Sequence, residues 1–255
     1  MIAGDWFLLG APWDCSGSGR GEQEAPGAFR KAGISSLVGR DLGDATTLIE
    51  TAQRDDDTGV LGLWETARAA NALADVLAAA IDDLPGLRAL VVGGDCSILF
   101  GVFPALRRQV GPAGLWFLDG HPDYLDGQTS DTGETADMDL AVLTGDGAAP
   151  LIRLAGTPPM VPASDAILLG HRTNDLDEGA AADLARLPNA LRQIDAATMS
   201  VDRGGLDWDQ FAAVLEPLAQ SPQLLGLSLA DFRPDLDPTG EFARRVLDVL
   251  ERTLP

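Results

Sequence analysis

The chain has few of the residues that build disulfide frameworks, and it has no long apolar run. Its 255 residues include two cysteines and two histidines. Cys15 and Cys96 are too few for a disulfide scaffold. No apolar run approaches the ~20 residues that a membrane-spanning helix needs, and the first residues lack a basic segment followed by an apolar one. We therefore expect a soluble protein in a reducing, cytoplasmic setting.

Basic residues are also scarce. The chain carries 18 lysines and arginines against 39 aspartates and glutamates, which gives a formal net charge of −21. Such a surface repels nucleic-acid phosphates and anionic lipids, so we expect neither nucleic acid nor a membrane as partner. The simplest interpretation of the charge is solubility, and acidity alone indicates no function.

The apolar residues, 45% of the chain, fall into short runs that alternate with helix-length amphipathic segments. The runs are nearly continuous, which is typical of strands buried on both faces of a parallel sheet. Predicted strands are 6–10, 89–94, 114–119, 166–170, 224–230 and, more weakly, 190–194. Predicted helices are 62–81, 98–109, 176–187, 207–219 and 240–254. The alternation predicts an α/β fold, and no repeat or linker divides residues 1–255 into separate domains.

Several predicted strands end in glycine or aspartate followed by a polar turn. In an open parallel sheet the ligand crevice lies outside the carboxyl ends of the strands, so the chemistry is expected there. The first strand is not followed by G-x-G-x-x-G, and there is no P-loop. The glycine-rich stretch 17–30 lacks the Walker lysine. A nucleotide-binding oxidoreductase is therefore disfavoured.

One strand exit, "WFLDGHPDYLDG" (116–127), places Asp119, His121 and Asp123 at alternate positions. Fully extended, the two aspartates would lie ~13 Å apart at ~3.3 Å per residue, too far for one metal ion. If the chain curls, which Gly120 and Pro122 permit, two carboxylates and an imidazole converge. This donor set suits Mn, Fe or Zn better than Ca or Mg. The alternative is a solvated polar turn, and we favour metal binding.

A second exit is "VVGGDCSILF" (91–100). Gly93 and Gly94 allow a tight turn, and Asp95 can cap the following helix. Cys96 then lies near a helix N-terminus, a position that lowers a thiol's pKa and suits a metal ligand or a nucleophile. The alternative is a small, buried apolar residue.

Two further exits carry polar residues. Asp231 ends the strand before a proline-bounded turn, where we interpret Asp235 and Asp237 as capping residues. His171 and Arg172 leave another strand together. His171 is predicted to line the pocket or, as the alternative, to cap a helix or to hold a pocket residue in place without contacting the substrate. Arg172 is predicted to bind a substrate carboxylate or to pair with nearby acids.

Taken together, these segments resemble the ureohydrolase superfamily of arginases, agmatinases and formiminoglutamases. "GAPWDCSGSGRGEQEAPGAFR" is similar to the family's opening loop, and "GGDCS" to its Gly-Gly-Asp-His-Ser. "DGHPD" matches Asp-Ala-His-x-Asp at all three ligand positions. "LSLADFRP" is similar to the closing strand. The resemblance runs nearly end to end, and it implies a three-layer α/β/α arginase-like fold with a mostly parallel sheet.

The resemblance also implies roles for particular residues. Asp119, His121 and Asp123 would bind manganese, of which the family holds two ions. Asp231 would stand where the family's substrate-contacting carboxylate lies, so His121 and Asp231 would be the catalytic residues. Cys96 replaces a metal-binding histidine of the family, and its softer sulfur shifts the preference toward Zn or Fe.

The chain departs from the family between its last two predicted strands. The family has a strand there that ends in Ser-x-Asp-x-Asp and supplies two more aspartate ligands. Residues 199–203 stand in its place, so one strand and two ligands are predicted to be absent. One metal ion, or none, is then expected.

Two functions remain open. The first is hydrolysis of a guanidino or amidino C–N bond of a small molecule, in which a metal-bound hydroxide attacks the carbon and Asp231 holds the cation. The second is a degenerate family member that binds one metal ion or none and has lost hydrolysis. The sequence favours the first, and it leaves the substrate and the oligomeric state open.

Overall fold

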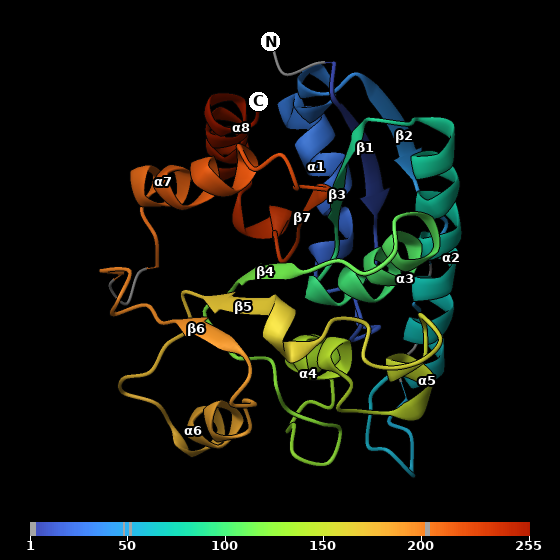
Figure 1. Ribbon diagram of the computed structural model, residues 1–255, viewed down its shortest axis with the longest axis vertical. Helices are drawn as coiled ribbons and strands as arrows, with labels where there is room; N and C mark the ends of the chain where they lie inside the picture. Colours follow the sequence, from blue (N-terminus) through green and yellow to red (C-terminus); the bar gives the residue numbers. More distant parts are fainter. Residues whose placement is uncertain (1–3, 48, 51–52, 202–204) are drawn as a thin grey trace.

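The structure, a computed structural model, describes residues 4–47, 49–50, 53–201 and 205–255 (Figure 1). Its strands are β1 (Trp6–Ala11), β2 (Arg40–Asp44), β3 (Arg88–Gly93), β4 (Leu115–Leu118), β5 (Ala166–Leu169), β6 (Arg192–Ile194) and β7 (Gly226–Leu229). Its α-helices are α1 (Ala25–Ala32), α2 (Leu63–Asp83), α3 (Leu99–Gln109), α4 (Asp139–Thr144), α5 (Ala149–Ile152), α6 (Glu178–Ala185), α7 (Trp208–Ala219) and α8 (Glu241–Thr253). Short 3-10 helices are η1 (Glu22–Glu24), η2 (Ile34–Leu37), η3 (Cys96–Ile98), η4 (Thr135–Met138), η5 (Ala163–Asp165) and η6 (Pro234–Leu236).

The strands pair in parallel, as predicted, but they form two sheets. The first has the order β2-β1-β3-β7 and the second the order β4-β5-β6. In Figure 1 the strands of the second sheet run across the direction of β1 and β3. The α/β fold is therefore confirmed, while the sheet is divided between β7 and β4.

The division coincides with the predicted absence of a strand. In the described part of the chain, no strand occurs between β6 and β7. Residues 199–201, the first part of the segment that replaces the strand, form a turn in which the Val201 N–H donates to the Ala196 carbonyl at 2.8 Å. Residues 202 and 203 lie outside the described residues. Among the described residues no strand pairs with both β7 and β4, so each of these two strands is paired on one side only.

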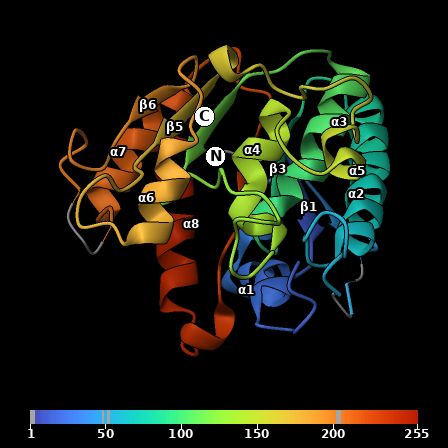
Figure 2. The ribbon, with the colours of Figure 1, turned by 90° about the horizontal axis from the view of Figure 1, so that it is seen from below.

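Helices cover both faces of the first sheet, because its side chains alternate between two cores. Phe7 and Leu9 of β1 belong to a core that includes α2 and α3, which lie side by side (Figure 2). Trp6 and Leu8 belong to a second core with α1, α7 and α8. Alternate residues of these strands therefore pack against helices on opposite faces of the sheet, which gives a three-layer arrangement.

Burial differs among the strands that were predicted to be buried on both faces. Every residue of β1 is buried, as is β3 after its first residue. In β4, Trp116 is 41% exposed and Leu118 is 37% exposed. The residues of β6 are all exposed. The prediction of two-sided burial is wrong for β4 and β6, whereas Ala166, Leu168 and Leu169 of β5 are buried.

The predicted helices and strands are present with shifts of a few residues at their ends. Four regular elements were not predicted: β2, α1, α4 and α5. The sequence of β2, "RDLGD", is polar and fully exposed, so it carries no apolar signal. Its position comes from pairing with β1. Helix α1 begins in the glycine-rich stretch, where Pro26 suits the first turn.

A cavity of about 470 Å³ lies between the two sheets. Its lining comes from β4, β7, the start of β3, α3 and α7, and it reaches the site described below at Cys96, Asp119 and Asp231. The described helices include none with the length and apolar character that a membrane crossing requires.

Candidate metal and substrate site

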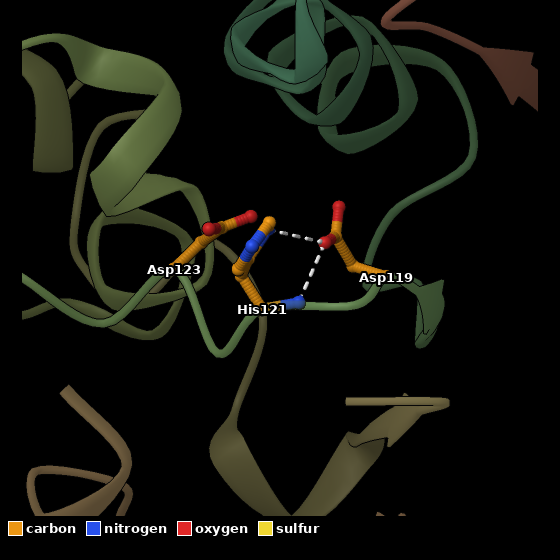
Figure 3. Close-up of side chains that lie close together, drawn as sticks. All are labelled: Asp119, His121 and Asp123. Atoms are coloured by element: carbon orange, nitrogen blue, oxygen red, sulfur yellow. Dashed lines mark hydrogen bonds and ion pairs between the residues drawn. The ribbon is translucent and has the colours of Figure 1, made fainter. Parts of the chain in front are cut away.

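Asp119, His121 and Asp123 converge just beyond the end of β4. One ligand atom from each lies within 4.8 Å of the others, so one metal ion could contact all three (Figure 3). Asp123 is buried, while the His121 side chain is 65% exposed. The predicted curl of the chain is confirmed. The solvated turn that stood as the alternative does not account for the burial of Asp123.

The curl is produced by Asp123 itself. Its φ of 48° is in the left-handed region, which reverses the chain direction after Pro122. The Asp123 carbonyl then accepts hydrogen bonds from the N–H groups of Leu140 and Ala141, at 3.1 and 3.2 Å. The Asp119 carboxylate accepts from the His121 N–H at 2.8 Å. The Asp119 oxygen that accepts from the His121 N–H is also 3.5 Å from the His121 Nδ1, so the same contact orients both side chains (Figure 3).

The charges around this group favour a bound cation. Burial raises the pKa of Asp123 well above its ordinary value, and the carboxylates of Asp119 and Asp139 raise it further. The pKa of His121 is raised by its interaction with Asp119, against the effect of desolvation. A divalent ion would reverse this balance, because it makes the ionised form of each carboxylate the favourable one.

Cys96 lies at the start of η3, beside this group. Asp95 caps η3 by accepting from the Ser97 N–H at 3.0 Å, as predicted. The thiol is buried, and its Sγ donates to the Ala136 carbonyl at 3.5 Å. Burial raises the pKa of Cys96, and the carboxylates of Asp139, Asp231 and Asp123 raise it further. The predicted lowering of the thiol pKa is therefore wrong for the metal-free protein, because burial and nearby acids outweigh the helix terminus.

Asp231 reaches the same place from β7. Its N–H donates to the Gly94 carbonyl at 2.8 Å, which ties it to the exit of β3. Its φ of 59° turns the chain there. Asp231 is exposed and forms part of the cavity wall. Desolvation, followed by the charges of Asp95 and Asp119, raises its pKa to about 7.

Arg172 lies against the metal-binding group, whereas His171 is enclosed. The Arg172 Nη1 is 3.2 Å from the His121 Nε2. The backbone N–H of Arg172 donates to the Gly120 carbonyl at 3.1 Å. His171 is buried, and its Nδ1 has no hydrogen-bond partner in the described part of the chain. Burial lowers the pKa of His171. Only Arg172 of this pair presents its charge near the group.

The family model for the arginase family matches residues 4–184, which is more than half of the chain. The chain belongs to the arginase family.

Similar proteins agree with this membership. The arginase of Bacillus caldovelox is 32% identical over 180 residues, which cover 68% of this chain and 58% of that protein. The arginase structure from Bacillus cereus has a TM-score of 0.81 at 21% identity, covering 97% of both chains. That of Entamoeba histolytica arginase with L-ornithine has a TM-score of 0.80 at 16% identity, covering 98% of both. At these identities the structures show the arginase-like fold alone.

The matched segment of this arginase-family chain ends before the segment that departs from the family. Cys96, Asp119, His121 and Asp123 lie within it, and Asp231 lies beyond it. In sequence, the match covers 58% of the length of the Bacillus caldovelox arginase. Residues 185–255 lie beyond the match to the family model.

Two buried carboxylates near the site were not predicted. Asp139 begins α4, and Asp183, in α6, accepts a hydrogen bond from the Tyr124 N–H at 2.8 Å. Burial raises the pKa of Asp183 to about 6, against that bond. Neither residue follows a strand, so the strand-exit argument misses both. The only signal for Asp139 is its place between the apolar residues Met138 and Leu140.

Of the two residues interpreted as capping residues after Asp231, Asp237 caps a helix and Asp235 does not. The Asp237 carboxylate accepts from the N–H groups of Glu241 and Ala243, at 2.8 and 2.9 Å, and so caps the start of α8. Asp235 pairs with Arg233 at 2.7 Å. Both carboxylates are therefore engaged within the turn.

Proposed function

We propose that this chain hydrolyses a guanidino or amidino C–N bond of a small molecule in a metal-dependent reaction. One observation carries the proposal. Asp119 and Asp231 line one cavity, although they follow strands of different sheets. A group of metal-binding side chains therefore faces a carboxylate that can hold a cationic substrate.

The donor set fits a divalent metal ion. Asp119, His121 and Asp123 would hold it, with Cys96 beside them, and two carboxylates plus an imidazole suit Mn, Zn or Fe. Bound there, such an ion would supply Lewis acidity and a nucleophile generated from water at neutral pH. Manganese is the metal expected from the family resemblance, and Cys96 is the feature that favours Zn or Fe.

The protein's own residues would bind and orient the substrate. The Asp231 carboxylate would pair with the guanidinium and place its carbon next to the metal-binding group. Arg172, exposed beside His121, would bind a carboxylate of the substrate. The complex of the Entamoeba histolytica arginase contains an amino acid, L-ornithine, which supports a substrate with a carboxylate. His171 is buried, so it would help to position Arg172 and would not contact the substrate.

A second candidate function is metal binding without hydrolysis. It is favoured by the division of the sheet, since no strand between β6 and β7 in the described residues supplies the two further aspartates expected for a two-metal site. Under this alternative the chain binds one ion and turns over no guanidine.

The remaining parts of the proposal concern setting. Cys15 and Cys96 are both free and buried, which supports a reducing compartment such as the cytoplasm. We also propose that residues 1–255 form one arginase-like domain, because both cores share β1 and β3.

Metal content and turnover of the Asp231→Asn variant test the proposal. Protein purified without chelator and then loaded with Mn²⁺ or Zn²⁺ should release urea from at least one member of a guanidine panel. Asn keeps the shape of Asp231 but removes a charge-assisted pair worth roughly 1.5–3 kcal/mol, so kcat/KM should fall about tenfold to a hundredfold. Plasma emission spectrometry should find the metal content unchanged.

The matched control is Asp235→Asn, which removes a carboxylate that pairs with Arg233 outside the cavity. It should leave kcat/KM unchanged. Loss of metal from Asp231→Asn would make Asp231 a ligand, contrary to its proposed role. If metal-loaded wild type hydrolyses no guanidine or amidine, the proposed hydrolysis is wrong and metal binding without hydrolysis remains.

A further inference from the structure

The cavity between the two sheets has a wall that is largely apolar. All residues of β4 and β7 contribute to it, together with apolar side chains of α3 and α7 such as Phe103 and Leu215. Its volume of about 470 Å³ lies within the range of about 300–1,000 Å³ that small-molecule sites occupy. The proposed hydrolysis uses only Cys96, Asp119 and Asp231 of this wall, so the apolar part has no role in it.

Three large apolar side chains of this wall are exposed to solvent. Trp116 and Leu118 of β4, and Leu225 just before β7, are each more than a third exposed. Removing apolar surface from water stabilises a complex in proportion to the area that is covered. The wall of this one cavity therefore presents apolar surface that a ligand can cover.

The charged residues of the wall all have the same sign. They are Asp119, Asp165 and Asp231, and among the described residues no lysine, arginine or histidine lines the cavity. Because Leu115 pairs with Ala166, Asp165 lies at the amino-terminal end of β4, whereas Asp119 follows its carboxyl end. An anionic ligand would be repelled in such a cavity, and a cationic one attracted. The wall therefore suits a molecule with an apolar body and a cationic group.

A strand of another chain fits this cavity less well than a small molecule. β4 and β7 are each paired on one side only, and a free strand edge can accept a further strand. However, β7 is parallel to β3, whereas β4 runs across the direction of β3 (Figure 1). One extended segment therefore cannot pair along both edges, and a small molecule does not meet this restriction.

We propose that this cavity binds the apolar arm, an alkyl or aryl group, of a guanidine or amidine whose cationic group pairs with Asp231. The inference rests on the proposed function and adds the class of substrate. Arg172 is not part of the cavity wall, so a carboxylate bound by Arg172 belongs to another substituent of the same molecule. An amidine can carry both, because its carbon and its nitrogen each bear a substituent.

Binding of an alkylguanidine series tests this proposal. The full chain without added metal is titrated by calorimetry with methylguanidine, butylguanidine and hexylguanidine. Each added methylene that enters the cavity should tighten binding about fourfold, and the heat-capacity change of binding should become more negative. Hexanoate, which has an apolar chain of similar length and the opposite charge, should show no binding.

Variants of the exposed wall residues locate the arm. Trp116→Ala should weaken hexylguanidine binding about tenfold and leave methylguanidine binding unchanged, because only the longer chain reaches the indole. Leu225→Ala, on the other side of the cavity, should have the same selective effect at roughly threefold. The matched control is Trp64→Ala, which removes an exposed tryptophan outside the cavity wall. It should change neither affinity.

The outcomes distinguish this inference from the proposed function. If affinity does not rise with chain length but the metal-loaded protein hydrolyses guanidines, the inference is overturned and the proposed function stands. If affinity rises with chain length and Trp116→Ala removes the rise, the inference stands even where no guanidine is hydrolysed. Equal binding of hexanoate would overturn it. So would a dimer in sedimentation that Trp116→Ala dissociates, because a second copy would then cover this wall.

Discussion

The two sheets are built from similar apolar runs but differ in how fully they are covered. The first sheet lies between α2 and α3 on one face and α1, α7 and α8 on the other. In the second sheet, Trp116 and Leu118 of β4 are substantially exposed. An apolar run therefore predicts a strand, while its burial depends on which neighbours are present.

The candidate site joins these unequal halves. Cys96 and Asp231 follow strands of the first sheet, and Asp119 and Arg172 follow strands of the second. No hydrogen-bonded strand pair crosses the division among the described residues. The side chains that could hold a metal ion therefore lie where, among the described residues, no strand pairing joins the two sheets.

The largest expected effect compares equal truncations in the two sheets. Leu90 in β3 is fully buried, and Leu118 in β4 is 37% exposed. Leu90→Ala should lower the free energy of unfolding by about 2–5 kcal/mol, because it leaves a cavity in the core. Leu118→Ala should cost less than about 1 kcal/mol. Urea denaturation measures both. Equal costs would show that the β4 face is covered in solution, for example by a second copy.

The next effect concerns the junction itself. Zn²⁺ at a hundredfold excess over its Kd should stabilise the protein by about 2.7 kcal/mol, because it binds only the folded chain. His121→Ala should remove both this gain and any hydrolysis. Since the His121 side chain is 65% exposed, the metal-free variant should unfold like wild type. Differential scanning calorimetry with and without Zn²⁺ measures this. A variant that kept the full gain would show that His121 is not a ligand.

The third effect is a difference in pH response between the halves. Asp183 in α6 has a pKa raised to about 6, so the metal-free folded state holds a proton that the unfolded chain releases near 3.9. Its contribution is complete at low pH and is lost as pH rises from about 4 to 6, with a slope of at most about 1.4 kcal/mol per pH unit. Asp183→Asn should remove this contribution, so that stability falls less steeply than in wild type as pH rises from about 4 to 6 in unfolding measurements from pH 3 to 7.

Asp237, in the first half, should respond in the opposite direction. Desolvation raises its pKa, but the N–H groups of Ala243, Phe242 and Glu241 lower it more, so the net pKa is below its ordinary value. Its contribution is present above about pH 4 and disappears as pH falls below that. Asp237→Asn should flatten the acid side of the profile only. The same change of slope in both variants would refute the assignment.

Much of the fold was predictable because the strands of parallel sheets are apolar and the helices amphipathic. The convergence of Asp119, His121 and Asp123 was also predictable, since the spacing of ligand types along one strand exit is local information. Exposed β2 was not predictable, because its five residues carry no apolar signal and gain their structure from β1.

The properties that depend on distant segments could not be predicted. The thiol pKa of Cys96 was expected to be low from its place at a helix start. It is raised by burial and by carboxylates that come from β7 and from residues 123 and 139. Asp139 was missed for the same reason, because only the folded chain shows that it is buried beside Cys96.

The pairing of β3 with β7 also has a consequence for how the chain folds during synthesis. It joins Ala89 to Gly226, across more than half of the sequence, whereas β4, β5 and β6 all lie within residues 115–194. Closing so long a loop costs more conformational entropy than the local pairings of the second sheet. Until residues 226–229 have left the ribosome, β3 has an unpaired edge, although the less buried sheet can already be complete. The better-covered half of the molecule is therefore the half that must wait longest for its last strand.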